Sequence, residues 1–202
     1  MPFDLASLDA PFAALKAYDW GGDAAPFKAI DDAVVAAHGD AALRTDLEKR
    51  FAAILGAGSS RAAKEYACRK LMMIGTAASV PALAALLDDT DNSHMARFAL
   101  ERIPAPEAAQ ALRTALGTAQ GSLQIGMIES LGGRGDAASV PALARLLAGD
   151  APVAAAAGKR AEAQGIYQKL ADAVKGKPGA KRVELAAARG LLACLDTLNA
   201  AS

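Results

Sequence analysis

The side chains that could bind a metal ion are few and widely separated in the sequence. The chain has two histidines, His38 and His94, and two cysteines. A zinc site on a helix needs a second ligand three or four residues further along the same face. Alanines follow His38 at those positions, and an arginine and a phenylalanine follow His94. We therefore expect no metal site and no cofactor, with His94 in a first-turn hydrogen bond and His38 at the carboxyl end of a helix.

The serines and carboxylates that could act in catalysis lack suitable neighbours. No histidine and acid pair accompanies Ser79 or Ser59-Ser60. The pairs Asp31-Asp32 and Asp88-Asp89 could share acid and base roles only where their surroundings separate the two pKa values, and adjacent exposed carboxylates lack such surroundings. The glycine-rich run 132–136 follows no predicted strand and lacks the Gly-Lys-Ser/Thr ending of a phosphate-binding loop. We expect helix caps, solvated helix ends and a hairpin linker, and no enzyme.

A basic cluster could bind an anionic partner. Four basic residues lie within one predicted helix, and the first two share a face: Arg61, Lys64, Arg69 and Lys70. Nonspecific binding to nucleic acid depends on an overall attraction for phosphate. The chain has a net charge of +0, and aromatic residues make up only 4% of it. We expect a solvated helix face here.

An internal repeat defines the elements that must position these side chains. Residues 77–87 return at 137–147 with one change, Ala85 to Arg145, and a degenerate copy lies at 106–116. One leucine holds the same place in the three copies, in steps of 29 and 31 residues: Leu83, Leu112 and Leu143. A period of about 30 residues is typical of stacked helical hairpins. The 53 alanines also favour helix.

Periodicity, caps and breakers predict where the helices lie. The expected ranges are 11–18, 26–37, 41–55, 61–74, 79–87, 93–103, 106–116, 122–131, 139–148, 160–173 and 180–198. Ser79, Asn92 and Ser93 are predicted N-caps. Pro81 falls in a first turn, where a missing amide loses no hydrogen bond.

We expect a single domain over residues 1–202. Residues 1–60 are predicted to be N-terminal capping helices, 61–150 three repeats, and 151–202 a C-terminal capping hairpin. The end of a stack must cover an apolar face, and the first segment has residues suited to that: Phe3, Leu5, Leu8, Phe12, Leu15 and Trp20. Cys68 and Cys194 would fall in different repeats, so we expect two free, mostly buried thiols.

The repeat pattern resembles that of a known family. Residues 75–89 and 135–150 carry Gly-x-x-Ala-Ser-Val-Pro-Ala-Leu-x-x-Leu-Leu, which resembles HEAT repeats of the bilin-lyase-like subclass. Four tracts, 18–21, 31–38, 93–97 and 159–170, look like uncharacterised HEAT-repeat proteins of planctomycete-type bacteria, and 158–172 resembles a tetratricopeptide-like helix. The resemblance implies a scaffold or binding role. We expect an all-α fold, a right-handed α-solenoid of HEAT-like hairpins with a tetratricopeptide-like C-terminal hairpin.

The expected function is a non-catalytic scaffold that binds a protein partner on the concave helix surface. The second helix of each hairpin, 79–87, 106–116 and 139–147, would form that surface. Exposed arginines on these helices and their neighbours are the predicted contacts: Arg97, Arg113 and Arg145.

Two alternatives stay open. One is an accessory subunit of bilin-lyase type. The other is nucleic-acid binding through the basic C-terminal end, since residues 158–202 hold eight basic and four acidic side chains whereas residues 1–60 hold five basic and nine acidic ones. We expect a monomer or weak oligomer without membrane association. As written, the sequence predicts a cytoplasmic protein, or an extracytoplasmic one if a signal peptide was removed.

Overall fold

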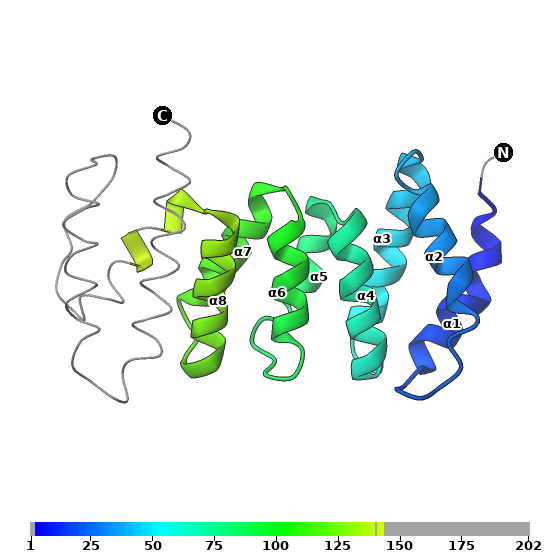
Figure 1. Ribbon diagram of the computed structural model, residues 1–202, viewed down its shortest axis with the longest axis horizontal. Coiled ribbons are helices and arrows are strands. Elements are labelled where there is room, and N and C mark those ends of the chain that lie inside the picture. Colours follow the sequence, from blue (N-terminus) through cyan, green and yellow to red (C-terminus); the bar gives the residue numbers. More distant parts are fainter. Residues whose placement is uncertain (1–2, 140, 144–202) are drawn as a thin grey trace. The chain divides into compact units, whose positions relative to one another are not determined.

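The computed structural model describes residues 3–139 and 141–143, and every regular element in these ranges is a helix (Figure 1). The elements are η1 (Leu5–Leu8), α1 (Asp9–Ala17), α2 (Phe27–Ala36), α3 (Ala41–Leu55), α4 (Arg61–Ile74), η2 (Ala77–Ser79), α5 (Val80–Ala84), α6 (Ser93–Arg102), α7 (Pro106–Leu116), α8 (Gly121–Arg134) and η3 (Ala137–Ser139), where η marks a 3-10 helix. None of the described helices is long and apolar enough to cross a membrane. The predictions for Arg145, Cys194 and the C-terminal hairpin lie outside the described residues.

The chain divides into two compact units, Met1–Ala111 and Leu112–Ser202, and the boundary falls inside α7. We describe each unit by itself. The expected single domain stays a prediction.

The helices of the first unit pack in two rows. Along one row, α4 packs against both α2 and α6, and along the other, α3 packs against α5 and η2. The two rows also contact each other, because α3 packs on α4 and α5 packs on α6. Figure 1 shows α2, α4 and α6 following one another, with α3 and α5 behind them. Neighbouring helices of each row are therefore next but one in the sequence.

The ends of α3 and α4 show why these segments are helical. The Asp40 carboxylate accepts hydrogen bonds from the amides of Ala42 and Leu43, both at 3.0 Å, and so satisfies two of the free donors at the start of α3. Ser60 caps α4 in the same way, with Oγ 3.0 Å from the Ala63 amide. Both helices have the bounds that the sequence predicted.

Two sets of leucines with identical spacing are fully buried. In the first helix of each predicted hairpin these are Leu71, Leu100 and Leu131, and in the second they are Leu83, Leu112 and Leu143. Both sets step by 29 and then 31 residues. The 3-10 helices η2 and η3 have the same sequence, Ala-Ala-Ser, and each directly precedes helical residues. Equivalent positions of the sequence repeat thus have equivalent local structure.

The glycine-rich run 132–136 is mostly helical, so its prediction as a hairpin linker is wrong. Helix α8 continues to Arg134, and Gly135 ends it with a φ of 62°. The Asp136 amide then donates to Leu131 O at 3.0 Å and the Gly135 amide to Gly132 O at 3.0 Å. This Schellman arrangement satisfies carbonyl groups at the end of the helix and needs glycine only at position 135. Buried Gly132 lies in the last turn of the helix.

The N-terminal segment contributes a smaller apolar surface than predicted. Leu8, Phe12 and Leu15 are buried, and the Phe12 and Phe51 rings pack with centroids 5.1 Å apart. Trp20, however, is 58% exposed, so its prediction as a capping residue is wrong. The Gly22 amide donates to Asp19 O at 3.0 Å and Gly21 has a φ of 87°, so Trp20 lies at the corner of a tight turn.

Candidate functional site

The most deeply buried carboxylate that the structure describes belongs to Glu48, on α3. Glu48 is only 5% exposed. Its Oε1 accepts hydrogen bonds from the Thr76 amide at 2.7 Å, Thr76 Oγ1 at 2.9 Å and Ser79 Oγ at 2.6 Å. Thr76 follows the glycine that ends α4, and Ser79 ends η2. The carboxylate therefore links α3 to the turn between α4 and α5, and its burial and three donors leave it a structural rather than a catalytic group.

The Glu48 contacts correct one prediction and reveal one residue that the sequence analysis missed. Ser79 occupies the position before α5 but makes no side-chain cap, because its hydroxyl donates to Glu48. Asn92 likewise makes no side-chain cap at α6, since its amide group donates to Asp89. A signal for Glu48 existed: it lies three residues before Phe51 and seven before Leu55, on the buried stripe of α3.

Arg113 makes the matching contact in the second unit. Its Nη1 lies 2.7 and 2.6 Å from the two carboxylate oxygens of Asp136, which follows the glycine that ends α8. The exposed fractions of the two side chains are 23% and 12%. The prediction of Arg113 as an exposed charge is therefore wrong, because most of its side chain is covered and it forms an ion pair.

A second polar cluster joins α2 to α4. Tyr66 Oη donates to Asp31 Oδ1 at 2.5 Å, and Lys70 Nζ lies 2.7 Å from the same oxygen. Burial alone would raise the pKa of Asp31, but hydrogen bonds from Lys70 and Tyr66 and the charges of Lys70 and Lys28 bring it below its ordinary value. Burial, with the adjacent carboxylate, raises the pKa of Tyr66. Tyr66 therefore stays a protonated donor at neutral pH.

The predicted basic cluster on α4 is largely compensated within the first unit. Arg69 forms an ion pair with Glu65, and Lys70 pairs with Asp31. Arg61 lies over the Trp20 ring, with Cζ 5.6 Å from its centroid. The acidic excess of residues 1–60 and the basic residues of α4 thus offset each other in part.

Cys68 is a buried free thiol, as the sequence predicted. Burial, together with the charge of Glu65, raises the pKa of Cys68 to about 12. A thiol with this pKa is not a nucleophile at neutral pH. Among the described residues, no three histidine, cysteine or carboxylate side chains lie where they could share a metal ion.

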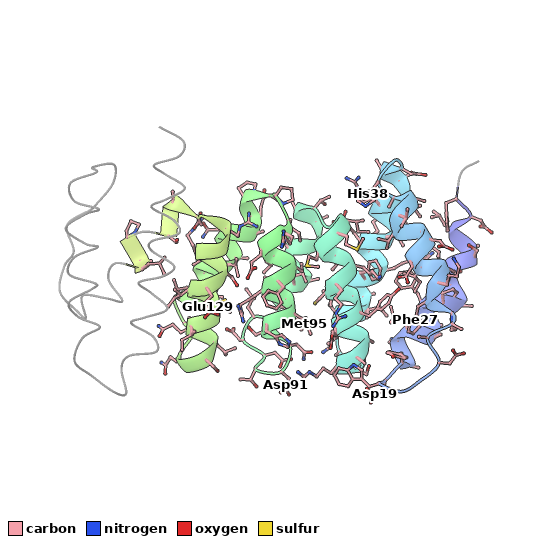
Figure 2. The ribbon with its side chains drawn as sticks, viewed as in Figure 1. Asp19, Phe27, His38, Asp91, Met95 and Glu129 are labelled. Atoms are coloured by element: carbon pink, nitrogen blue, oxygen red, sulfur yellow. The ribbon has the colours of Figure 1, made fainter. Side chains whose placement is uncertain are left out.

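Two exposed aromatic residues with arginines beside them are the surface features best suited to recognition. Trp20 is 58% and Phe98 50% exposed. Arg61 Cζ lies over the Trp20 ring, and Arg97 Cζ lies 5.9 Å from the Phe98 ring centroid. The loops that hold Asp19 and Asp91 lie at one edge of the first unit, where α4 and α6 begin, whereas His38 lies at the opposite edge (Figure 2). The Trp20 turn is held at that edge by a hydrogen bond from Ser60 Oγ to Tyr18 O.

Comparison with known proteins gave no match: no protein-family model, curated protein or solved structure is significantly similar to this chain.

Proposed function

We propose that the chain is a non-catalytic protein-binding scaffold, built as a right-handed α-solenoid of HEAT-like helical pairs. The observation that carries this proposal is the pair of buried leucine series, which share the steps of 29 and 31 residues in the first and second helices. Such matching is what a stack of like helical pairs requires, because each pair must bury the same positions against its neighbours. A stack of this kind extends its surface with every pair added, and proteins use such surfaces for recognition.

The chemistry of the described side chains agrees with recognition rather than reaction. The carboxylates of Glu48 and Asp31 are held by structural hydrogen bonds, and the pKa of the Cys68 thiol is raised to about 12. Nucleophilic or general-base catalysis needs such groups accessible and with a pKa suited to the reaction. These groups instead connect helices.

The proposed partner contacts combine arginine with exposed aromatic surface. Arg97 keeps its predicted place because it lies beside Phe98 on α6, and Arg145 is proposed from the sequence alone. Arg113 contributes indirectly, through its ion pair with Asp136. Trp20 and Arg61 form a further contact of the same composition. Aromatic residues and arginine are enriched among the residues that dominate binding energy at protein interfaces.

Affinity purification of the tagged chain from its source, followed by titration of the purified partner, tests this function. We expect Phe98→Ser and Trp20→Ser to weaken binding, one or both by tenfold or more, corresponding to about 1.4 kcal/mol. Val35→Ser is the matched control, because Val35 is an exposed apolar residue on α2 with no arginine contact identified. Equal affinity of all three variants and the original chain would exclude both aromatic contacts.

A further inference from the structure

The repeated stretches pose a problem of register during folding. Residues 77–87 and 137–147 differ at a single position. The buried residues of the two copies are also equivalent, since Ser79 matches Ser139 and Leu83 matches Leu143, all fully buried. An apolar surface on a preceding helix therefore has little with which to distinguish the first turn from the second. Near-identical repeats need a further device to exclude incorrect pairing.

The residue just before each copy differs, and it contacts the helix that precedes the hairpin. In the first unit this residue is Thr76, whose amide and hydroxyl donate to Glu48 on α3. In the second unit it is Asp136, whose carboxylate accepts from Arg113 on α7. The polarity of the contact is thus reversed: the helix supplies the acceptor in one unit and the donor in the other.

We propose that the contacts Glu48–Thr76 and Arg113–Asp136 act as a register code, which lets each preceding helix accept only one of the two near-identical turns. Exchange of the partners would place the Glu48 carboxylate against that of Asp136, two like charges at a buried position. Arg113 would then face Thr76, a neutral residue, and its covered guanidinium would lose its counter-charge. An unpaired charge at a buried site is strongly destabilising.

Stability alone is a weaker explanation for these polar residues. Buried polar pairs contribute little net stability compared with apolar residues of the same size, and their best-attested role is to specify register. Glu48 fits that role because it lies on the apolar stripe of α3 and is only 5% exposed. α3 also packs directly on η2 and α5, the elements that the code would select.

The central test gives the first turn the identity of the second. Thr76→Asp places a carboxylate at the position of the Thr76 hydroxyl, which lies 2.9 and 3.1 Å from the two oxygens of Glu48. We expect the ratio of folded to unfolded chain in urea titration to fall at least about tenfold. Glu48→Gln should restore most of this loss in the double variant, because a neutral amide of the same size removes the repulsion and can donate to the introduced carboxylate.

Thr45→Asp is the matched control, since Thr45 is exposed on the same helix and its hydroxyl bonds only to Ala41 O of that helix. It should leave the urea midpoint nearly unchanged and show no coupling with Glu48→Gln. Additive effects of Thr76→Asp and Glu48→Gln would overturn the proposal, because residues 48 and 76 would then not recognise each other's charge.

Refolding separates a register code from an ordinary stabilising contact. We expect the Thr76→Asp chain, refolded from urea at high concentration, to give an added slow phase and a dimer fraction by light scattering, as incorrectly paired repeats exchange helices between chains. The double variant E48Q/T76D should lose both. A Thr76→Asp chain that is less stable but refolds as a monomer in the original single phase would overturn the code.

Discussion

Gly75 lies so close to Ile103 that no side chain fits between them. A Cβ atom built on Gly75 would lie 2.8 Å from Ile103 Cδ1 and 2.5 Å from the Leu71 carbonyl oxygen. The φ of Gly75 is −62°, which any residue adopts. Glycine is therefore required here by space and not by backbone conformation. It lets the chain leave α4 while the end of α6 packs against it.

This relationship predicts that Gly75→Ala destabilises the chain. The Leu71 oxygen belongs to the backbone and cannot move aside cheaply, so we expect the free energy of unfolding to fall by about 1–3 kcal/mol, as for other overpacked positions. Gly39→Ala is the control, because the nearest atom to its added Cβ would be Ala36 O at 3.9 Å. Urea titration of both variants decides the matter, and equal midpoints would mean that the α4–α6 contact tolerates a methyl group.

The Asp31 cluster predicts a specific loss of stability in acid. The pKa of folded Asp31 lies below its ordinary value of 3.8, so the carboxylate stabilises the fold above that pH and loses this contribution as the pH falls through the folded pKa. The original chain should exceed Asp31→Asn in stability by a constant amount above about pH 5, and the difference should shrink towards pH 3. The effect is small because the side chain is half exposed.

Asp32→Asn serves as the control for this measurement, since Asp32 is a neighbouring exposed carboxylate paired only with Lys28. Its difference from the original chain should be smaller over the same pH range. An Asp31→Asn difference that grows in acid would contradict the contacts with Tyr66 and Lys70.

Cys68 should resist thiol reagents until the chain unfolds. With the pKa raised to about 12, the reactive thiolate at about pH 8 is rarer than in a free cysteine by on the order of a thousandfold. The measurement uses the Cys194→Ser background and an aromatic disulfide reagent, first without and then with denaturing urea. Reaction without urea at the rate of a free thiol would contradict the burial of Cys68.

The sequence predicted the helices where strong local signals mark both ends. Asp40 and Ser60 are good N-caps, and α3 and α4 have the predicted bounds. Local signals failed where a distant residue decided the outcome. Ser79 has the right position for a cap, but its hydroxyl binds Glu48, which lies 31 residues earlier. Trp20 has a large apolar ring, yet the tight turn at Gly21 leaves it exposed.

The run 132–136 shows a different failure, in which composition outweighed position. Glycine has poor helix propensity, so three glycines predict a break. Buried Gly132 nevertheless lies in the last turn of α8, and only Gly135, with its positive φ, ends the helix. The predicted contacts Arg97, Arg113 and Arg145 were chosen as charges on repeat helices. Sequence alone could not show that Asp136 pairs with Arg113.

Small-angle X-ray scattering of the full chain at several concentrations tests the proposed stack of helical pairs most directly. A globular protein of 202 residues has a radius of gyration of about 17 Å. The α-solenoid predicts a clearly larger value and an asymmetric pair-distance distribution with a long tail, unchanged on dilution. A radius near 17 Å with a symmetric, bell-shaped distribution would contradict the stack and, with it, the extended binding surface.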